Sequence, residues 1–202
     1  EGNNDTFTGG AGTDIIQLSS GSHTFSTDNK VNTIETFVAN SSGSTLVLTG
    51  QTEGFTISGG AGVDDLTGGN ADDIITGGAG NDTLVGGTGN DTFNVDSGTD
   101  IITLLGGDNS GAGGDSDVLV VSAGATVNAT NINSFTATTA SSNAGTANLS
   151  TKAAGGTINM AASNSGAYNI NGGAGNDILT GGGGNDIFTV AATTEADDDT
   201  IN

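Results

Sequence analysis

The stretch GGNADDIITGGAGNDTLVGGTGNDTFNV, Gly68–Val95, repeats one pattern every nine residues. Each unit begins with two glycines, has an aspartate at its sixth position and has an apolar residue at its eighth. We write the unit as GGxGxDxUx, in which U is apolar. Gly59–Thr67 adds one unit before the stretch, and Val95–Thr103 adds a degenerate unit that overlaps its end. This tandem run determines the prediction for the whole chain.

The same unit also occurs outside the tandem run, at Gly9–Gln17, Gly172–Thr180 and Gly181–Thr189, and weaker copies end at Thr8, Val120 and Asn202. The U position tests whether these copies are real, because only 33% of the chain is hydrophobic. All eleven copies have an apolar residue there, which chance does not explain. The U residues are Phe7, Ile16, Leu66, Ile75, Leu84, Phe93, Ile102, Leu119, Leu179, Phe188 and Ile201.

The unit has a simple physical explanation. U and its two neighbours form a short strand, in which U points inward and the neighbours point outward. The glycines allow the positive φ angles of a tight turn, and the aspartate closes this turn over a cation together with backbone carbonyls. Two units make one coil of about 18 residues, so each loop lies against the loop two units further along, one strand spacing of about 4.8 Å away. The expected neighbours are Asp64 with Asp82, Asp73 with Asp91, and Asp82 with Asp100.

The chain of 202 residues is strongly acidic: it has 23 Asp and Glu residues, two lysines and no arginine, and its formal net charge is −21. A nucleic-acid interface needs a basic patch, and an anionic membrane surface would repel this chain, so we expect neither partner. Few aromatic residues and a high net charge are typical of disordered chains. The regular placement of the apolar residues instead indicates a chain that folds when its charge is neutralised.

The groups available to bind a cation are carboxylates and carbonyls, with no cysteine and one histidine, and this set selects a hard ion. A flexible glycine-rich loop suits Ca²⁺ better than octahedral Mg²⁺. Carboxylates stacked one strand spacing apart would also repel strongly without a cation. For the acidic stretch Glu195–Asp199, a solvated turn is an equal alternative. We predict several Ca²⁺ ions, held by turn carbonyls and by the side chains of Asp5, Asp14, Asp64, Asp73, Asp82, Asp91, Asp100, Asp117, Asp177, Asp186 and Asp199.

The tandem units, GGAGNDTLV above all, resemble the RTX or haemolysin-type calcium-binding nonapeptide repeat. The resemblance implies an all-β fold, a right-handed parallel β-roll or β-solenoid with Ca²⁺ bound in its turns. It also implies a protein that Gram-negative bacteria secrete, typically by type I secretion. Four loops depart from the pattern, and we expect them to bind Ca²⁺ weakly or not at all. The departures are Ala71, the pair Val95 and Asp96, Asn3, and Asp115.

A longer repeat lies over the short one. GFTISGGAGVDDLTGG at Gly54–Gly69 aligns without gaps with AYNINGGAGNDILTGG at Ala167–Gly182, at an offset of 113 residues. Upstream, VNTIETFVAN at Val31–Asn40 parallels ATNINSFTATT at Ala129–Thr139. The segments between the motif runs alternate in hydrophobicity like strands, and we expect them to form wider coils without metal.

We therefore predict two copies of one module in a continuous solenoid. The first copy covers residues 1–105, with motif turns at 1–17 and 59–103. The second, diverged copy covers residues 106–202, with motif turns at 112–120 and 172–189. Because the sequence starts and stops within such repeats, we expect it to be a segment of a longer chain.

The sequence offers little for catalysis. It has no H-E-x-x-H, G-x-S-x-G or P-loop motif and no cysteine nucleophile. With one histidine and no arginine, acid–base or phosphate chemistry lacks its usual groups. We expect that the chain is not an enzyme and that His23 is a solvent-facing strand residue.

Motif runs that alternate with Thr-, Ser- and Ala-rich segments resemble the RTX-containing surface-layer proteins and giant adhesins of bacteria. This resemblance implies a calcium-dependent structural component of a secreted cell-surface assembly, which folds and assembles outside the cell. Its partner would be further copies of itself, with lipopolysaccharide or glycan as partners of regions outside this segment. The expected location is the bacterial cell surface, and no apolar run approaches the length of a transmembrane helix.

Two alternatives stay open. One is the repeat module of a secreted enzyme or toxin whose catalytic part lies outside these residues, although such modules usually have one compact block of repeats. The other is an ice-binding solenoid, which needs a regular Thr/Asn ladder in its loops. GGTGND occurs once, at Gly86–Asp91, and neighbouring units have Ala or Asn in place of the threonine.

Overall fold

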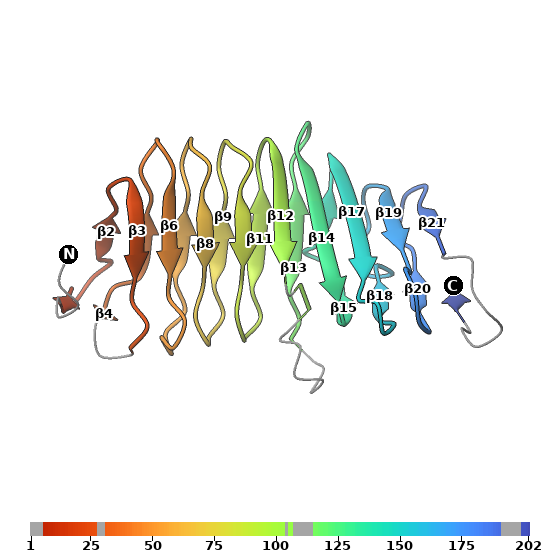
Figure 1. Ribbon diagram of the computed structural model, residues 1–202, viewed down its shortest axis with the longest axis horizontal. Coiled ribbons are helices and arrows are strands. Elements are labelled where there is room, and N and C mark those ends of the chain that lie inside the picture. Colours follow the sequence, from red (N-terminus) through yellow and green to blue (C-terminus); the bar gives the residue numbers. More distant parts are fainter. Residues whose placement is uncertain (1–5, 28–30, 104, 107–114, 191–198) are drawn as a thin grey trace.

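The computed structural model describes residues 6–27, 31–103, 105–106, 115–190 and 199–202. In this part of the chain the regular elements are all β-strands, and every strand pairing is parallel. The coils stack along the long axis of the molecule, from the N-terminal end to the C-terminal end (Figure 1). No described segment forms a helix of the length and apolar character needed to span a membrane. The predicted all-β parallel solenoid is confirmed.

Two long sheets run along this stack. The first sheet has seven strands: β2 (Ile15–Gln17), β5 (Thr36–Val38), β7 (Thr56–Ser58), β9 (Ile74–Thr76), β11 (Thr92–Val95), β13 (Val118–Val121) and β16 (Ser142–Asn143). The second sheet has nine: β3 (Gly21–Thr24), β6 (Ser44–Val47), β8 (Asp65–Thr67), β10 (Thr83–Val85), β12 (Thr99–Thr103), β14 (Thr126–Ile132), β17 (Thr146–Thr151), β19 (Tyr168–Asn171) and β21 (Ile187–Thr189).

Two shorter sheets complete the coils at either end of the stack, beside the two long sheets. Near the N-terminus this sheet consists of β1 (Phe7–Thr8) and β4 (Val31–Asn32). In the C-terminal half it consists of β15 (Ser134–Thr136), β18 (Thr157–Asn159), β20 (Ile178–Thr180) and β22 (Thr200–Ile201).

In the tandem run, the chain passes from one long sheet to the other at every strand. Thr83 on β10 lies opposite Asp65 on one side and Ile101 on the other. Residues that stack in this run are 18 apart in sequence, as Asp64 and Asp82 are. The predicted coil of two nine-residue units is therefore confirmed.

Several coils outside the tandem run are longer, although Asn169 and Ile187 again stack 18 residues apart. The stacked pair Asp91 and Asp117 is 26 residues apart, and Asn128 and Asn148 are 20 residues apart. The wider coils expected between the motif runs are thus present. The strands β6 to β9 and their counterparts at the offset of 113 residues, β18 to β21, occur in the same order but on different sheets. The division into two modules stays a prediction.

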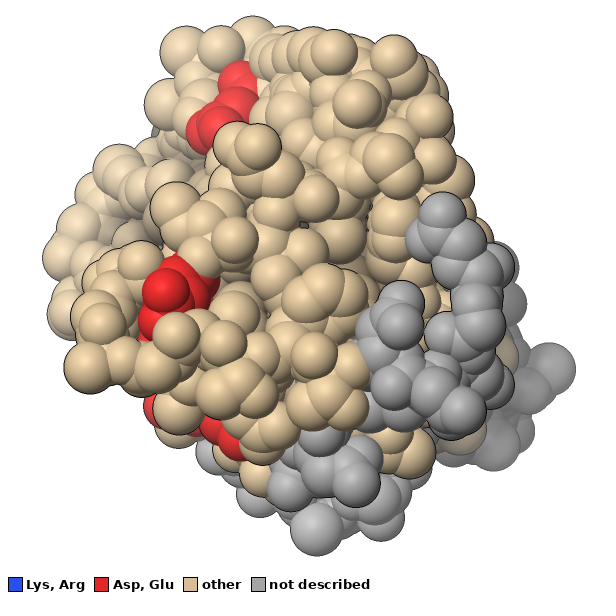
Figure 2. All heavy atoms as spheres, turned by 90° about the vertical axis from the view of Figure 1, so that its left-hand side faces the viewer, with Lys and Arg blue, Asp and Glu red and all other residues tan. Residues whose placement is uncertain are grey.

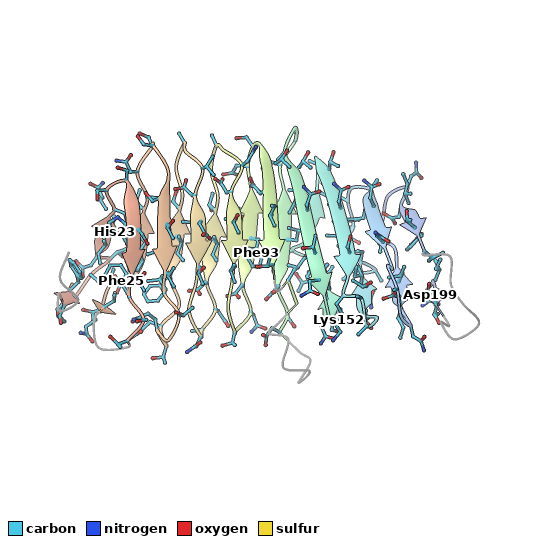
Figure 3. All side chains as sticks on the ribbon, in the orientation of Figure 1. His23, Phe25, Phe93, Lys152 and Asp199 are labelled. Atoms are coloured by element: carbon cyan, nitrogen blue, oxygen red, sulfur yellow. The ribbon has the colours of Figure 1, made fainter. Side chains whose placement is uncertain are left out.

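The U residues form the core of the stack because each points inward from its strand. Leu66, Ile75, Leu84, Phe93, Ile102, Leu119 and Leu179 are fully buried, and Figure 3 shows Phe93 within the central coils. Ile16 and Phe188 are partly buried against the same core. Phe7 and Ile201 are 38% and 50% exposed, because they lie in the outermost strand pairings at the two ends of the stack.

The turns need glycine where the backbone enters the left-handed region. Gly60, Gly78 and Gly87, each the second glycine of its unit, have φ values of 104°, 92° and 115°. A side chain at these positions would be strained. The second glycine of the motif therefore sets the backbone course of the turn.

His23 corrects one expectation. It lies on β3 in register with the core residue Leu46, and its side chain is half-buried rather than solvent-facing. Its ring nitrogen Nε2 lies 2.9 Å from the carbonyl oxygen of Ser19. His23 occupies a core row near the end of the second sheet (Figure 3), where fewer coils cover it.

Candidate metal centre

Six motif aspartates form two lines along the stack. The first aspartate row contains Asp64, Asp82 and Asp100, at the start of β8, β10 and β12. The second aspartate row contains Asp73, Asp91 and Asp117, at the start of β9, β11 and β13. All six are at most 2% exposed, so these charges lie inside the turns. On the face seen from the N-terminal side, acidic residues form small, separate patches (Figure 2).

Each carboxylate is tied to the backbone of the neighbouring coil. In the first row, the N–H of Asp64 donates to Oδ1 of Asp82 at 2.9 Å, and the N–H of Asp82 donates to Oδ1 of Asp100 at 3.0 Å. In the second row, the N–H of Asp73 donates to Asp91 at 2.9 Å, and that of Asp91 donates to Asp117 at 2.9 Å. The three predicted stacked pairs are confirmed.

The first row leaves its other carboxylate oxygens without a partner. Oδ2 of Asp64, Asp82 and Asp100 is buried and accepts no hydrogen bond. A buried carboxylate oxygen without a partner is costly. This arrangement is stable if each oxygen has a ligand that the polypeptide itself does not supply.

The first glycine of the unit lets potential ligand oxygens approach the turn closely. A Cβ on Gly77 would lie 2.6 Å from Asp82 Oδ2 and 3.3 Å from Asp100 Oδ2. A Cβ on Gly59 would lie 2.8 Å from Asp64 Oδ2 and still closer to the carbonyl oxygen of Gly77. The absence of a Cβ therefore lets oxygens from two coils converge closely at this turn, and such oxygens are the donor set that Ca²⁺ prefers.

The two rows differ in one respect. In the second row, Oδ2 of Asp73 accepts the N–H of Gly69 at 2.7 Å, and Oδ2 of Asp117 accepts the N–H of Gly106 at 2.7 Å. These oxygens are already satisfied by backbone donors. The first row thus fits a cation better than the second at these positions. Asp73 belongs to the loop in which Ala71 replaces a motif glycine, where weak binding or none is expected.

Burial raises the pKa of all six carboxyls. The pKa reaches about 8 for Asp91, where Asp117 and Asp73 add repulsion to the effect of burial. It reaches about 6 for Asp73, Asp100 and Asp117, in each case chiefly through burial. The charged form of these residues is therefore unfavourable in the folded chain unless a cation compensates it.

The remaining predicted ligands are distributed over other loops. Asp177 is fully buried, its Oδ1 accepts the N–H of Gly156 at 2.7 Å, and its own N–H donates to Asp199 at 3.0 Å. Asp186 is half-buried and accepts the N–H groups of Tyr168 and Gly182, each at 2.8 Å. These contacts repeat the pattern of the two rows.

Two predicted ligands need separate mention. Asp14 is half-buried, and its Oδ2 is shielded and unpartnered. Asp5 lies outside the described residues, as does the stretch 195–198 of the acidic tail.

Carboxylates alone do not make these sites. Within the described residues, His, Cys, Asp and Glu form no group of three or more that could hold a metal ion. This agrees with the geometry of the first row, in which one carboxylate and one backbone carbonyl lie close to Gly59. A Ca²⁺ ion held here would take much of its coordination from turn carbonyls.

The comparison with known families supports this interpretation. The model of the RTX calcium-binding nonapeptide repeat matches four copies, at residues 1–22, 56–84, 76–111 and 164–192, which together cover more than half of the chain. The chain belongs to the RTX calcium-binding repeat family. RTX repeats bind calcium and occur in secreted proteins. No curated protein and no solved structure matches the chain.

One acidic residue that contacts an RTX loop is not among the residues predicted from the sequence. The N–H of Asp14 donates to Oε2 of Glu35 at 2.7 Å, so Glu35 takes the position of a motif aspartate in a segment without the motif. The sequence does contain a hint, because Glu35 precedes the inward residue Phe37 by two positions, as motif aspartates precede U. Without the glycine pair, this spacing alone was not recognised.

Proposed function

We propose that this RTX chain is a calcium-dependent structural component of a bacterial cell-surface assembly, of the surface-layer or adhesin type. The observation that supports it is the way one stack combines two kinds of coil. Motif coils with buried carboxylates occur at residues 59–103 and 172–189, and wide coils without the motif lie between them. Such a stack has the properties of a spacer or lattice element rather than of a compact accessory block.

The buried titratable side chains hold neighbouring coils together. The buried aspartates accept hydrogen bonds from neighbouring coils, and His23 packs in a core row. One open surface depression is lined by Gly21, Ser22, Ser42, Gly43, Ser44, Thr45 and Val63, which include no acid or base. We therefore propose that the chain has no catalytic activity of its own.

Calcium would induce folding of this component outside the cell. Without a cation, the buried and mutually repelling carboxylates oppose folding, so folding is coupled to metal binding. An unfolded chain is suited to export. When the free Ca²⁺ concentration is a hundred times the dissociation constant, each bound ion would stabilise the fold by about 2.7 kcal/mol. Several ions could therefore order the motif coils and make the stack rigid.

Assembly is tested by adding Ca²⁺ to the purified, calcium-free chain. We expect circular dichroism to show a gain of β-structure, and sedimentation velocity and negative-stain microscopy to show ordered higher assemblies. Mg²⁺ at the same concentration is the control. Strictly monomeric particles in saturating Ca²⁺ would contradict the assembly role, while leaving calcium-coupled folding intact.

The family match also favours a second candidate, the repeat module of a secreted enzyme or toxin. The two candidates differ in what accompanies the repeats. A protease, lipase or acylated toxin domain in the same polypeptide would favour the second candidate, and further alternating coils would favour the first.

An ice-binding role receives less support from the outward positions of the second sheet. The aligned row reads Thr45, Asp65, Thr83, Ile101, Asn128, Asn148, Asn169 and Ile187. This row mixes acidic, apolar and amide side chains instead of repeating threonine. A thermal-hysteresis measurement tests the role directly, and measurable activity would reinstate it.

A further inference from the structure

One loop repeats the geometry of the aspartate rows with only half of the motif. Gly9–Asp14 is a motif loop, and the segment opposite it in the next coil is Thr33–Glu35, which contains neither glycine nor aspartate. Ile16 and Phe37, two residues after Asp14 and Glu35, are paired in register. Glu35 therefore stands where the next motif aspartate would stand.

The hydrogen bonds agree with this alignment. The N–H of Asp14 donates to the Glu35 carboxylate at 2.7 Å, as the N–H of Asp64 donates to the Asp82 carboxylate at 2.9 Å. The longer side chain of Glu35 thus reaches the same backbone donor from a coil with a different loop.

The oxygens that lie close to Gly9 also match those that lie close to Gly59. A Cβ on Gly9 would meet the Thr33 carbonyl oxygen and Asp14 Oδ2. A Cβ on Gly59 would meet the Gly77 carbonyl oxygen and Asp64 Oδ2. Asp14 Oδ2, like its counterpart in the first aspartate row, is shielded and has no hydrogen-bond partner.

Thr33 holds its carbonyl in this position at a conformational cost. Its φ is 54°, in the left-handed region that β-branched residues rarely adopt. Its hydroxyl accepts the N–H of Gly10 at 2.8 Å, which ties the two coils together at this point. The backbone therefore follows the course of a glycine turn without a glycine.

We infer that Glu35 completes the Ca²⁺ site of Asp14 as its second carboxylate, with the Thr33 carbonyl among the ligands. This site joins a motif coil to the motif-free coil that follows it, so calcium binding extends beyond the nonapeptide repeats. The inference depends on the calcium binding of the RTX family but not on surface assembly. It holds equally if the chain proves to be part of an enzyme or toxin.

The test is calorimetric titration of the whole chain with Ca²⁺, starting from the calcium-free state. Glu35→Gln removes the charge but keeps an oxygen that can accept the N–H of Asp14. We expect this variant to bind one Ca²⁺ fewer than the parent chain, and hydrogen exchange at Gly9–Asp14 in saturating Ca²⁺ to rise to the rate seen with EGTA. Asp14→Asn should give the same loss, and the double variant should lose no more than either.

Glu53→Gln is the matched control, because Glu53 is an exposed acid in the next motif-free segment. It should bind the full number of ions. The proposal fails if Glu35→Gln binds the full number with unchanged affinity, or if the double variant loses two ions. It also fails if Glu35→Gln alone loses β-structure in saturating Ca²⁺ while Asp14→Asn does not, because Glu35 would then have a purely structural role.

Discussion

The motif coils at residues 59–103 and the coils at residues 118–176 form the same parallel ladder, but with charged side chains in the first region and neutral side chains in the second. In the motif coils, buried carboxylates meet the backbone of the next coil. Residues 118–176 contain no Asp or Glu at all. There the coils are joined by neutral amides: Asn148 donates to Asn128 at 2.8 Å and accepts from Asn169 at 2.7 Å.

Neutral donors also replace a cation in the turns of the second region. The Ser163 hydroxyl donates to the Ser141 carbonyl at 3.0 Å and lies 2.7 Å from the Tyr168 hydroxyl. Thr151 donates to the carbonyl of Gly172. Turn oxygens that converge on one another in the motif coils thus face hydroxyl hydrogens here. The comparison teaches that stacking itself needs no metal, and that calcium dependence belongs to the loops in which acids replace these donors.

Removal of calcium should give the largest difference in stability between the two regions. With EGTA, we expect the backbone amides of β8, β10 and β12 to lose protection from hydrogen exchange, because their loops then contain uncompensated buried carboxylates. Those of β14 and β17 should keep much of theirs. If the free Ca²⁺ concentration is a hundred times the dissociation constant, the loss of one ion should lower the protection factors of the amides it stabilises about a hundredfold. Equal loss of protection in both regions would show that the stack unfolds as one unit.

The pH dependence of the calcium-free chain should follow the same division. In the folded state the pKa is about 6 for Asp73 and Asp100 and about 8 for Asp91. These carboxyls therefore keep their protons up to a higher pH in the folded chain. The unfolded chain releases the same protons near pH 4. The folded state therefore binds more protons, and stability in EGTA falls as the pH rises from about 4 to about 8.

Urea unfolding in EGTA at pH 5, 7 and 9 measures this effect. In saturating Ca²⁺ the trend should reverse, because protons compete with the metal for the same oxygens. Protection factors at β17 should be insensitive to pH, since neither β17 nor the strands it pairs with, β14 and β19, contain an acid. A calcium-free chain that is more stable at pH 8 than at pH 5 would contradict the assignment of buried charge.

A single substitution in the first aspartate row should act with opposite sign in the two conditions. Asp82→Asn keeps the acceptor for the N–H of Asp64 but replaces the unpartnered Oδ2. In Ca²⁺ we expect the free energy of unfolding to fall by about 3 kcal/mol, the contribution of one ion. In EGTA the variant should be as stable as the parent chain or more stable, because a buried charge is gone.

Asp65→Asn is the control for this substitution, because Asp65 is the exposed neighbour of Asp64 in the same row of loops. It should change stability by less than about 0.5 kcal/mol in either condition. If Asp82→Asn destabilises equally with and without Ca²⁺, its carboxylate has a structural role and the first row is not a metal centre.

The regular part of this fold could be predicted from the sequence because the motif repeats at a fixed period. Glycines with positive φ, such as Gly78, and inward residues, such as Leu84, are set by local chemistry, so the coil length followed directly. The stacking of Asp64 on Asp82 followed from that length alone. The wide coils gave no such period, and their additional sheet at β15 and β18 was not foreseen.

The site was predictable to the same extent. Motif aspartates could be named, but which of their oxygens stay unpartnered depends on backbone donors such as Gly69 and Gly106, whose positions need the three-dimensional turn. Glu35 was missed because its contact with Asp14 crosses a longer coil. The prediction that His23 faces solvent was wrong because pairing of β3 with β6 places it beside the inward residue Leu46, whatever its polarity.

The amide ladder of the second region should give the smallest effect, and one that calcium does not change. Asn148→Ala removes the hydrogen bonds to Asn128 and Asn169 from a half-buried position. We expect a loss of about 1 kcal/mol in the free energy of unfolding, the net contribution of such hydrogen bonds. Thr130→Ala, at an exposed position on β14, is the control and should cost less than about 0.5 kcal/mol.

Urea unfolding in Ca²⁺ and in EGTA should give the same difference for Asn148→Ala, since no carboxylate lies nearby in sequence. A larger loss in Ca²⁺ than in EGTA would mean that the two regions are energetically coupled, and that the ladder helps to position the metal loops.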